Sequence, residues 1–140
     1  MKLDLPIIKF RGWDNVSKQM LPVEKIDFRE NHISLNEGGN SLSDTFEMID
    51  LMQYTGLKDV NGKEIYVGDI VKCTELRGEE LIEYVSTVEY DDCDLIVHES
   101  RTCDAWLSHF VPGIDKTPLT EIEVVGNIYE SSELLEKFNL

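Results

Sequence analysis

The residues of this 140-residue chain that could perform chemistry include three cysteines and three histidines. A cysteine next to a histidine can act as a nucleophile, and the chain offers Cys73 or Cys103 with His98 or His109. Neither cysteine is flanked by a glycine-rich elbow or by a helix start that would lower its thiol pKa. We therefore predict that both cysteines are small, buried apolar residues. A small hydrolase using a Cys/His or carboxylate site is the alternative.

Metal binding has little support in the sequence. Cys103, Asp104 and His109 form a C-D-x4-H pattern, whereas zinc sites usually contain short pairs of the type C-x2–4-C or H-x3–5-H. The acidic stretch 91–94 lacks the D-x-[DN]-x-[DN]-G spacing of a calcium loop and is expected to be a solvated hairpin turn. We expect no metal and no other cofactor.

Asp69 lies in the stretch V-G-D-I-V and alternates in phase with Ile65, Val67 and Val71, so its side chain could point inward. A buried carboxylate requires hydrogen-bond donors. The Asp69 carboxylate could bind a ligand or act as a general acid or base. It could instead accept backbone N–H bonds from the adjacent turn and fix a bend at Gly68, which is the interpretation we favour.

Aromatic residues supply the candidate interaction surface. Trp106, His109 and Phe110 lie in an irregular segment, 101–118, between two strand-like regions. Exposed aromatic side chains of small barrels can form grooves for peptides, and they suit self-association as well. An interface role and a core role remain open for these residues, and the expected partners are an unknown protein or a second copy of the chain in a homo-oligomer.

The charge balance narrows the classes of partner. The net charge is 13 − 28 = −15, which argues against direct binding to nucleic acid and favours basic or neutral partners. A surface that mimics DNA, as in an anti-defence factor, is an alternative, although the acidic residues alternate with apolar and basic residues and form no long runs. No apolar run approaches the roughly 18 residues of a membrane span. Without a recognisable secretory signal, we expect no membrane association and a cytoplasmic location.

The elements that position these residues are predicted to be mostly strands. Short alternating runs separated by Gly, Asn and Asp favour a small barrel. A phase shift between Val23 and Ile26 predicts a bulge, and residues 37–41 (EGGNS) predict a flexible loop. The ambiguous segment 41–56 is predicted to be mainly strand.

The middle and the end of the chain carry clearer signals. Asn61-Gly62 predicts a type I′ hairpin turn, and residues 63–73 predict one strand bent at Gly68. A strand with an internal glycine, Gly126, precedes a C-terminal helix that Ser131 or Ser132 would cap.

Three blocks carry a resemblance to a known family. They are KFRGWD at 9–14, LMQYTGLKDVNGKEIYVGDIVKC at 51–73 and IEVVGNIYESSELLEKF at 122–138. Together they resemble the YopX-like proteins, which are encoded largely by phages and prophages. Val125 is a conservative departure from the family's usual isoleucine.

The resemblance implies a fold but no activity. It implies a mainly β (α+β) protein whose later part is an SH3-like small barrel. We therefore expect an N-terminal region of short strands, 1–54, and a barrel with the C-terminal helix, 55–140, in one compact unit. Because the family has no assigned activity, no catalytic residue carries over. The function expected is that of a non-enzymatic module for protein binding or self-association.

Overall fold

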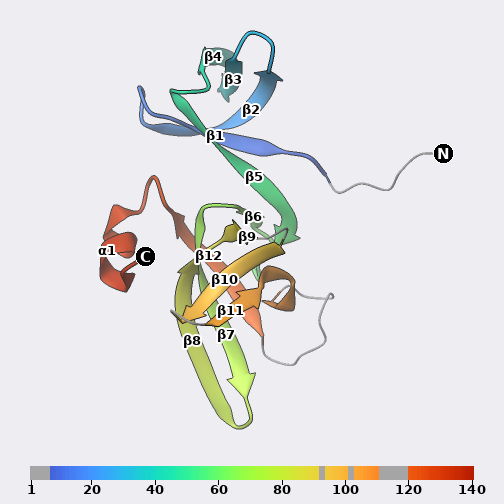
Figure 1. Cartoon of the computed structure of the whole chain (residues 1–140), viewed down its shortest axis with the longest axis vertical. Helices are drawn as coiled ribbons and strands as arrows, with labels where there is room; N and C mark the ends of the chain where they lie inside the picture. The colour runs from blue at the N-terminus through green and yellow to red at the C-terminus, as the bar shows by residue number, and fades with distance from the viewer. Residues whose placement is uncertain (1–6, 92–93, 101–102, 111–119) are drawn as a thin grey trace, which may run out of the picture. The chain divides into compact units, whose positions relative to one another are not determined.

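The computed structural model of the protein describes residues 7–91, 94–100, 103–110 and 120–140. Within these ranges the chain is mainly β with a short C-terminal helix, and this fold class was predicted (Figure 1). The chain divides into two compact units, Met1–Tyr54 and Thr55–Leu140. No helix in the described ranges has the length and the apolar character to cross a membrane.

The elements follow one another as short strands. The first unit contains β1 (Phe10–Asp14), β2 (Gln19–Asp27), β3 (His32–Glu37), β4 (Asn40–Thr45) and the start of β5 (Ile49–Lys58). The second unit contains the rest of β5, then β6 (Glu64–Tyr66), β7 (Asp69–Arg77), β8 (Glu80–Thr87), β9 (Glu89–Asp91), β10 (Asp94–Ser100), β11 (Cys103–Trp106), the 3₁₀ helix η1 (Leu107–Phe110), β12 (Glu121–Asn127) and α1 (Ser132–Phe138).

In the first unit the strands lie in the order β4-β3-β2-β1-β5, and each neighbouring pair is antiparallel. The predicted bulge is present, because the register between β2 and β3 shifts between Val23 and Lys25. The inner face packs around Ile33, Leu35 and Ile49.

The segment 37–41 is not a flexible loop, as the sequence had suggested. Gly38 and Gly39 form a two-residue turn between the hydrogen-bonded strands β3 and β4. Both have positive φ, 61° and 96°, which is the backbone that a type I′ turn requires. The Gly39 N–H also donates to the Asn36 side chain at 2.8 Å. The glycines therefore close a hairpin instead of loosening the chain.

The second unit contains two three-stranded antiparallel sheets, ordered β12-β7-β8 and β11-β10-β9. The expected SH3-like barrel is not closed within the described residues. One core joins the two sheets, and it includes Val71 and Cys73 of β7, Val97 of β10, and Ile122 and Val124 of β12.

The turn at Asn61-Gly62 differs from the type I′ turn that we predicted. Among the described residues, Gly62 has a φ of 78°, whereas Asn61 is not one of the residues with positive φ. The Gly62 N–H donates to the Asp59 carbonyl at 3.0 Å. This is the pattern of a type I turn followed by a left-handed glycine. The Asp59 carboxylate accepts the Asn61 N–H, which favours this turn over the I′ form.

Residues 63–73 are not one bent strand either. The strand breaks at Val67-Gly68, where β6 ends and β7 begins, and Gly68 has a φ of 95°. Gly68 and Asp69 are joined to Val88 by two backbone hydrogen bonds, Gly68 N–H to Val88 carbonyl at 2.9 Å and Val88 N–H to Asp69 carbonyl at 2.8 Å. This contact lies between β8 and β9, at Val88.

Candidate functional site

Asp69 is fully buried at the start of β7. One carboxylate oxygen accepts the Tyr66 N–H at 2.7 Å, across the turn that contains Gly68. This hydrogen bond supplies a donor for a charge that has lost its water. The side chain therefore fixes the corner between β6 and β7.

Cys73 is also fully buried, in the core of the second unit. Burial raises the pKa of its thiol to about 12, and the neighbouring Tyr84 side chain offsets only part of this effect. A thiol with such a pKa is protonated at neutral pH and is not a nucleophile. Cys93, and the side chains of Cys103 and His109, lie outside what the structure describes.

His98 lies on β10, and its imidazole pairs with the Glu89 carboxylate on β9. Neither Cys73 nor Asp69 is exposed beside it, because both are buried. Within the described ranges, no group of three His, Cys, Asp or Glu side chains is arranged to hold a metal ion.

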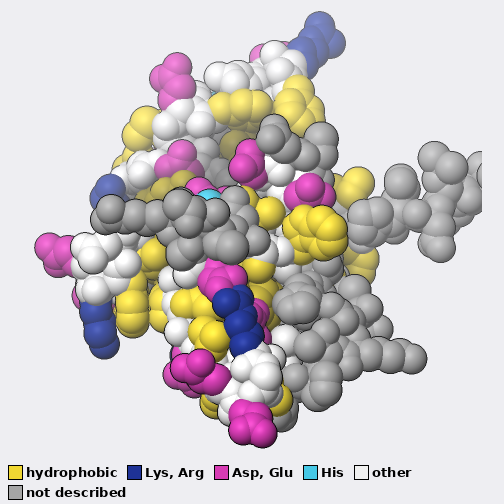
Figure 2. Space-filling model, turned by 60° about the horizontal axis from the view of Figure 1, so that its bottom comes forward, with side chains coloured by type: hydrophobic (Ala, Val, Ile, Leu, Met, Phe, Trp, Pro, Cys, Tyr) yellow, Lys and Arg dark blue, Asp and Glu magenta, His cyan; other side chains and the backbone are white. Residues whose placement is uncertain are grey.

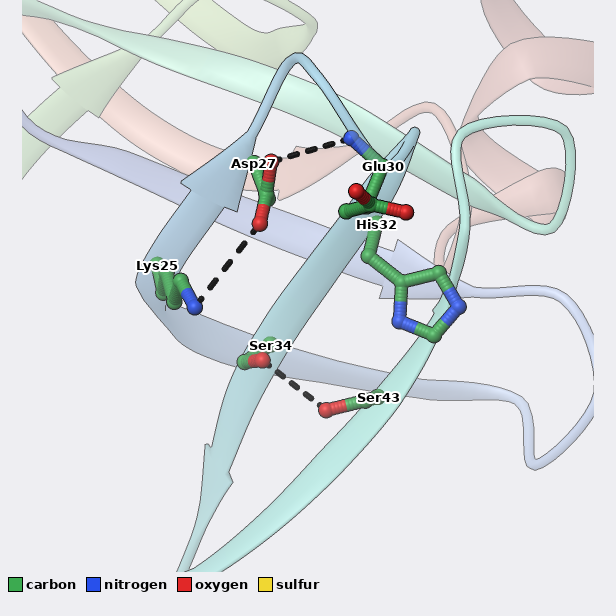
Figure 3. Close-up of a pocket in the computed structure, with 6 residues that line it drawn as sticks. All are labelled: Lys25, Asp27, Glu30, His32, Ser34 and Ser43. Atoms are coloured by element: carbon green, nitrogen blue, oxygen red, sulfur yellow. Dashed lines mark hydrogen bonds and ion pairs between the residues drawn. The ribbon is translucent and has the colours of Figure 1, made fainter.

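A polar hollow of about 400 Å³ opens on the outer face of the first unit (Figure 3). It is lined by Lys25, Asp27, Glu30, His32, Ser34 and Ser43. The Asp27 carboxylate accepts the N–H groups of Arg29 and Glu30 and lies 3.8 Å from the Lys25 ammonium group. The hydrogen bond from the Glu30 N–H holds the pKa of Asp27 below its ordinary value.

Serine, histidine and aspartate in this hollow have the composition of a catalytic triad, which the sequence analysis did not consider. Their geometry is different. The Ser34 and Ser43 hydroxyls bond each other at 2.8 Å, and Asp27 accepts N–H groups of its own turn. In Figure 3 the His32 ring extends away from the Lys25–Asp27 pair. A triad needs a chain of hydrogen bonds from carboxylate to imidazole to hydroxyl, and these side chains are paired otherwise.

The sheet β9-β10-β11 carries the most prominent aromatic surface of the second unit. Trp106 on β11 lies opposite Ile96 on β10, and Ile96 lies opposite Glu89 on β9. Residues directly opposite in antiparallel strands share one face. Trp106, Ile96 and Glu89 therefore form one row across the sheet. Trp106 is 67% exposed at the end of this row.

The two faces of this sheet are distinct. Leu95, Val97 and Ala105 contribute to the core, so they define the inner face. Asp94 and His98, two positions from Ile96, share its outer face by the alternation of a strand. Asp91 lies opposite Asp94 and joins the same face. We call Asp91, Asp94, Glu89, Ile96, His98 and Trp106 the outer face of the β9–β11 sheet.

Phe110 is not on this surface; of the interface and core roles that the sequence left open, it has the core role. It is 1% exposed in the core, and its ring meets that of Tyr84 edge to face, with 6.2 Å between centroids. Leu107 and Phe110 are three positions apart in η1, and such residues lie on one side of a 3₁₀ helix. Both side chains therefore pack in the core. Trp106 precedes η1, at the end of β11, and is exposed.

A second hollow, of about 510 Å³, borders the His98–Glu89 pair. Its other lining residues come from β8, β10 and the end of the chain: Val85 and Thr87, Glu99, and Phe138, Asn139 and Leu140. Glu99 also pairs with Arg77, which binds Glu75 as well, and the hydrogen bond to Glu99 is the main cause that raises the pKa of Arg77. Glu99 therefore has a cationic partner in Arg77, and Glu89 pairs with the His98 imidazole.

The acids are not gathered in one area on the face of the molecule in Figure 2. Asp and Glu side chains there are distributed among hydrophobic and Lys or Arg side chains. A DNA mimic requires carboxylates in a row at phosphate-like spacing, and this face does not offer one.

Comparison with known proteins identifies the family. The family described as YopX protein matches residues 9–136. The chain belongs to the YopX family. No curated protein matches it.

Two solved structures of similar fold support this assignment. Protein EF1440 from Enterococcus faecalis is 28% identical with a TM-score of 0.61, and the match covers 94% of this chain and 99% of that one. Protein yopX from Bacillus subtilis is 23% identical with a TM-score of 0.58, covering 91% of this chain and 95% of that one. These likenesses give the YopX family fold and no activity.

Proposed function

We propose that this YopX family protein is a non-enzymatic module that binds another protein through the outer face of the β9–β11 sheet. The observation that carries the proposal is the position of Trp106. Trp106 is 67% exposed, and it lies opposite Ile96, which is itself buried, in the antiparallel pair β10–β11. Tryptophan is enriched among the residues that dominate binding energy at protein interfaces.

Two alternatives have less support from the described residues. A Cys/His or carboxylate hydrolase is disfavoured by the burial of Cys73 and Asp69. A DNA mimic has the net charge of −15 in its favour, but the acids in Figure 2 are interspersed. The phage or prophage setting and the cytoplasmic location belong to the proposal as well.

The proposal is tested by affinity capture from a prophage-bearing host, followed by binding measurements with the purified, identified partner. Trp106→Ala is compared with Tyr90→Ala, because Tyr90 is 63% exposed on the same sheet but lies opposite Leu95, on the inner-face register. We expect Trp106→Ala to weaken binding at least about tenfold, the loss typical of an interface hot spot, and Tyr90→Ala to leave it nearly unchanged. Equal binding by the wild type and Trp106→Ala overturns the proposal.

Self-association is measured on the same variants by analytical ultracentrifugation. A wild-type dimer that Trp106→Ala dissociates would identify the second copy as the partner. A monomer at all concentrations, together with a captured partner, supports a heterologous module.

A further inference from the structure

We infer that the partner presents a basic segment to the outer face of the β9–β11 sheet, with a Lys or Arg side chain over the Trp106 indole. This inference rests on the proposed function and adds the chemistry of the partner. It follows from the charges that surround Trp106 and from the absence of a cation among the described residues of that face.

The charges on this face are of one sign. Asp91 and Asp94 lie directly opposite each other, and Glu89 lies two residues before Asp91 on β9. The described residues of β9, β10 and β11 include no Lys or Arg. The His98 imidazole on this face pairs with the Glu89 carboxylate.

Asp91 and Asp94 are exposed, and within the described part of the chain neither carboxylate forms a hydrogen bond or an ion pair. Like charges directly opposite across antiparallel strands repel and destabilise the pairing. A cation from a partner would remove this repulsion on binding. The pair therefore contributes more attraction to a basic ligand than two separate acids would.

Trp106 complements these carboxylates. An indole is the best aromatic partner for an ammonium or guanidinium group, and Arg also stacks on its face. Ile96, between Trp106 and Glu89, is only 6% exposed, so the contacts open to such a side chain on this face are the Trp106 ring and the carboxylates. One Lys or Arg could thus meet the Trp106 ring and a carboxylate together.

A second copy of this chain is a poor occupant of the surface. In a symmetric dimer the same patch meets itself, so Asp91, Asp94 and Glu89 would face their own copies. The net charge of −15 adds a repulsion between the chains as a whole. Charge complementarity instead selects a partner with a basic surface.

The test uses an end-capped peptide, Gly-Arg-Leu-Arg-Leu-Arg-Gly, and analogues in which every Arg is replaced by Gln or by Glu. The chain contains two tryptophans, so its ¹H–¹⁵N spectrum has two indole N–H signals, and Trp106→Phe assigns them. Trp13 is 8% exposed and serves as the internal control. We expect the Arg peptide to shift the Trp106 signal and to leave the Trp13 signal in place.

Matched variants separate this site from general attraction to an acidic protein. Asp91→Asn/Asp94→Asn and Glu79→Gln/Glu80→Gln remove the same charge, and the second pair lies at the exposed turn between β7 and β8. We expect the first pair to weaken the Arg peptide about tenfold, and the second pair to change binding less than about twofold. Trp106→Ala should weaken binding of the Arg peptide about fivefold, and the affinity of Trp106→Phe should lie between those of the wild type and Trp106→Ala.

Three results overturn the inference: an unmoved Trp106 signal, equal losses in both acid pairs, or equal binding of the Gln peptide. The proposed function has a separate outcome. A captured partner could require Trp106 but bind the wild type and Asp91→Asn/Asp94→Asn equally well. That result supports the proposed binding module and refutes the inference that the partner presents a basic segment.

Discussion

Asp59 and Val124 are 65 residues apart in the chain, and the Asp59 carboxylate accepts the Val124 N–H at 2.9 Å. The other carboxylate oxygen accepts the N–H groups of Asn61 at 2.9 Å and of Lys63 at 2.8 Å. Asp59 is 4% exposed, so three backbone donors depend on one buried side chain. This carboxylate ties the turn after β5 to β12 and stabilises the second unit.

Asp59→Ala should lower the free energy of unfolding by about 3 kcal/mol, because it leaves the buried Val124 N–H and two partly buried N–H groups without an acceptor. Urea denaturation measures the loss. Hydrogen exchange should speed up at Val124, Asn61 and Lys63. Asp59→Asn keeps one acceptor oxygen and should lie between the wild type and the alanine variant. An unchanged urea midpoint for Asp59→Ala contradicts a stabilising role for the Asp59 carboxylate.

Cys73 should resist alkylation by iodoacetamide in the folded protein at pH 8 and react once urea unfolds the chain. Burial keeps the reagent away from the sulfur atom. It also raises the pKa of the Cys73 thiol to about 12, so the reactive thiolate is scarce at pH 8. Peptide mass spectrometry reads the modified position directly. Rapid native labelling of Cys73 would reopen a nucleophilic role for this residue.

Gly126→Ala should destabilise the attachment of α1. A Cβ at this position would lie 2.8 Å from the Ser131 Cβ and 3.0 Å from Leu134 Cδ1, and it would also meet the Ser131 hydroxyl. Such overpacking costs about 1–3 kcal/mol. We expect the amides of α1 to exchange faster and the urea midpoint to fall.

Val125→Ala is the control for this variant, because Val125 is the neighbouring residue and is 40% exposed. It should change stability much less than Gly126→Ala does. The double variant Gly126→Ala/Ser131→Gly should recover part of the loss, since it removes the atoms that the new Cβ meets. Without any recovery, close packing of Gly126 on Ser131 is not the cause.

Local patterns predicted those elements of the fold whose signals are local. The phase shift near Val23 predicted the bulge in β2, and alternation predicted a mainly β chain. Turn type was less accessible. Asn61-Gly62 is a common I′ sequence, but the neighbouring Asp59 carboxylate binds the Asn61 and Lys63 N–H groups and selects another turn. The I′ backbone forms instead at Gly38-Gly39.

The candidate site was predictable in part, for a similar reason. The irregular segment that contains Trp106 and Phe110 was singled out, yet the two residues have opposite environments, 67% and 1% exposed. Which of them faces solvent depends on η1, whose 3₁₀ spacing turns Phe110 inward. The opposition of Asp91 and Asp94 depends on strand register, which the composition of the acidic stretch did not reveal.

Asp14 should stabilise the first unit in a pH-dependent way. Its side chain is 2% exposed, and burial alone would raise its pKa. Hydrogen bonds from the Ser17 hydroxyl at 2.5 Å and from the Val16 and Ser17 N–H groups, at 3.2 Å each, outweigh burial and lower the pKa below 3.8. The stabilisation is thus complete above the pKa of the unfolded chain and is lost as pH falls through the folded pKa.

Ser17→Ala removes the hydroxyl and should raise the pKa of Asp14, as a carboxyl ¹³C titration would show. At neutral pH it should lower stability by about 1 kcal/mol, and this difference should shrink in acid, where Asp14 is protonated in both proteins. A stability difference that stays constant through the acid range contradicts the linkage.

Asp94→Asn should increase stability, whereas most substitutions reduce it. It removes the repulsion between two carboxylates that lie directly opposite across β9 and β10. A cross-strand pair contributes about 0.2–1 kcal/mol, so we expect a gain in that range at low ionic strength. Salt screens exposed charges, and the gain should largely disappear near 1 M salt. Urea denaturation at two salt concentrations measures both effects.

Glu80→Gln is the matched control, since it also removes one exposed negative charge from the second unit. A similar gain in this variant would mean that the overall charge of −15, rather than the Asp91–Asp94 opposition, causes the effect. If only Asp94→Asn is stabilised, the same substitution should weaken the Arg peptide. Stability and binding would then change in opposite directions, because the repulsion that destabilises the free sheet is the attraction that a basic partner uses.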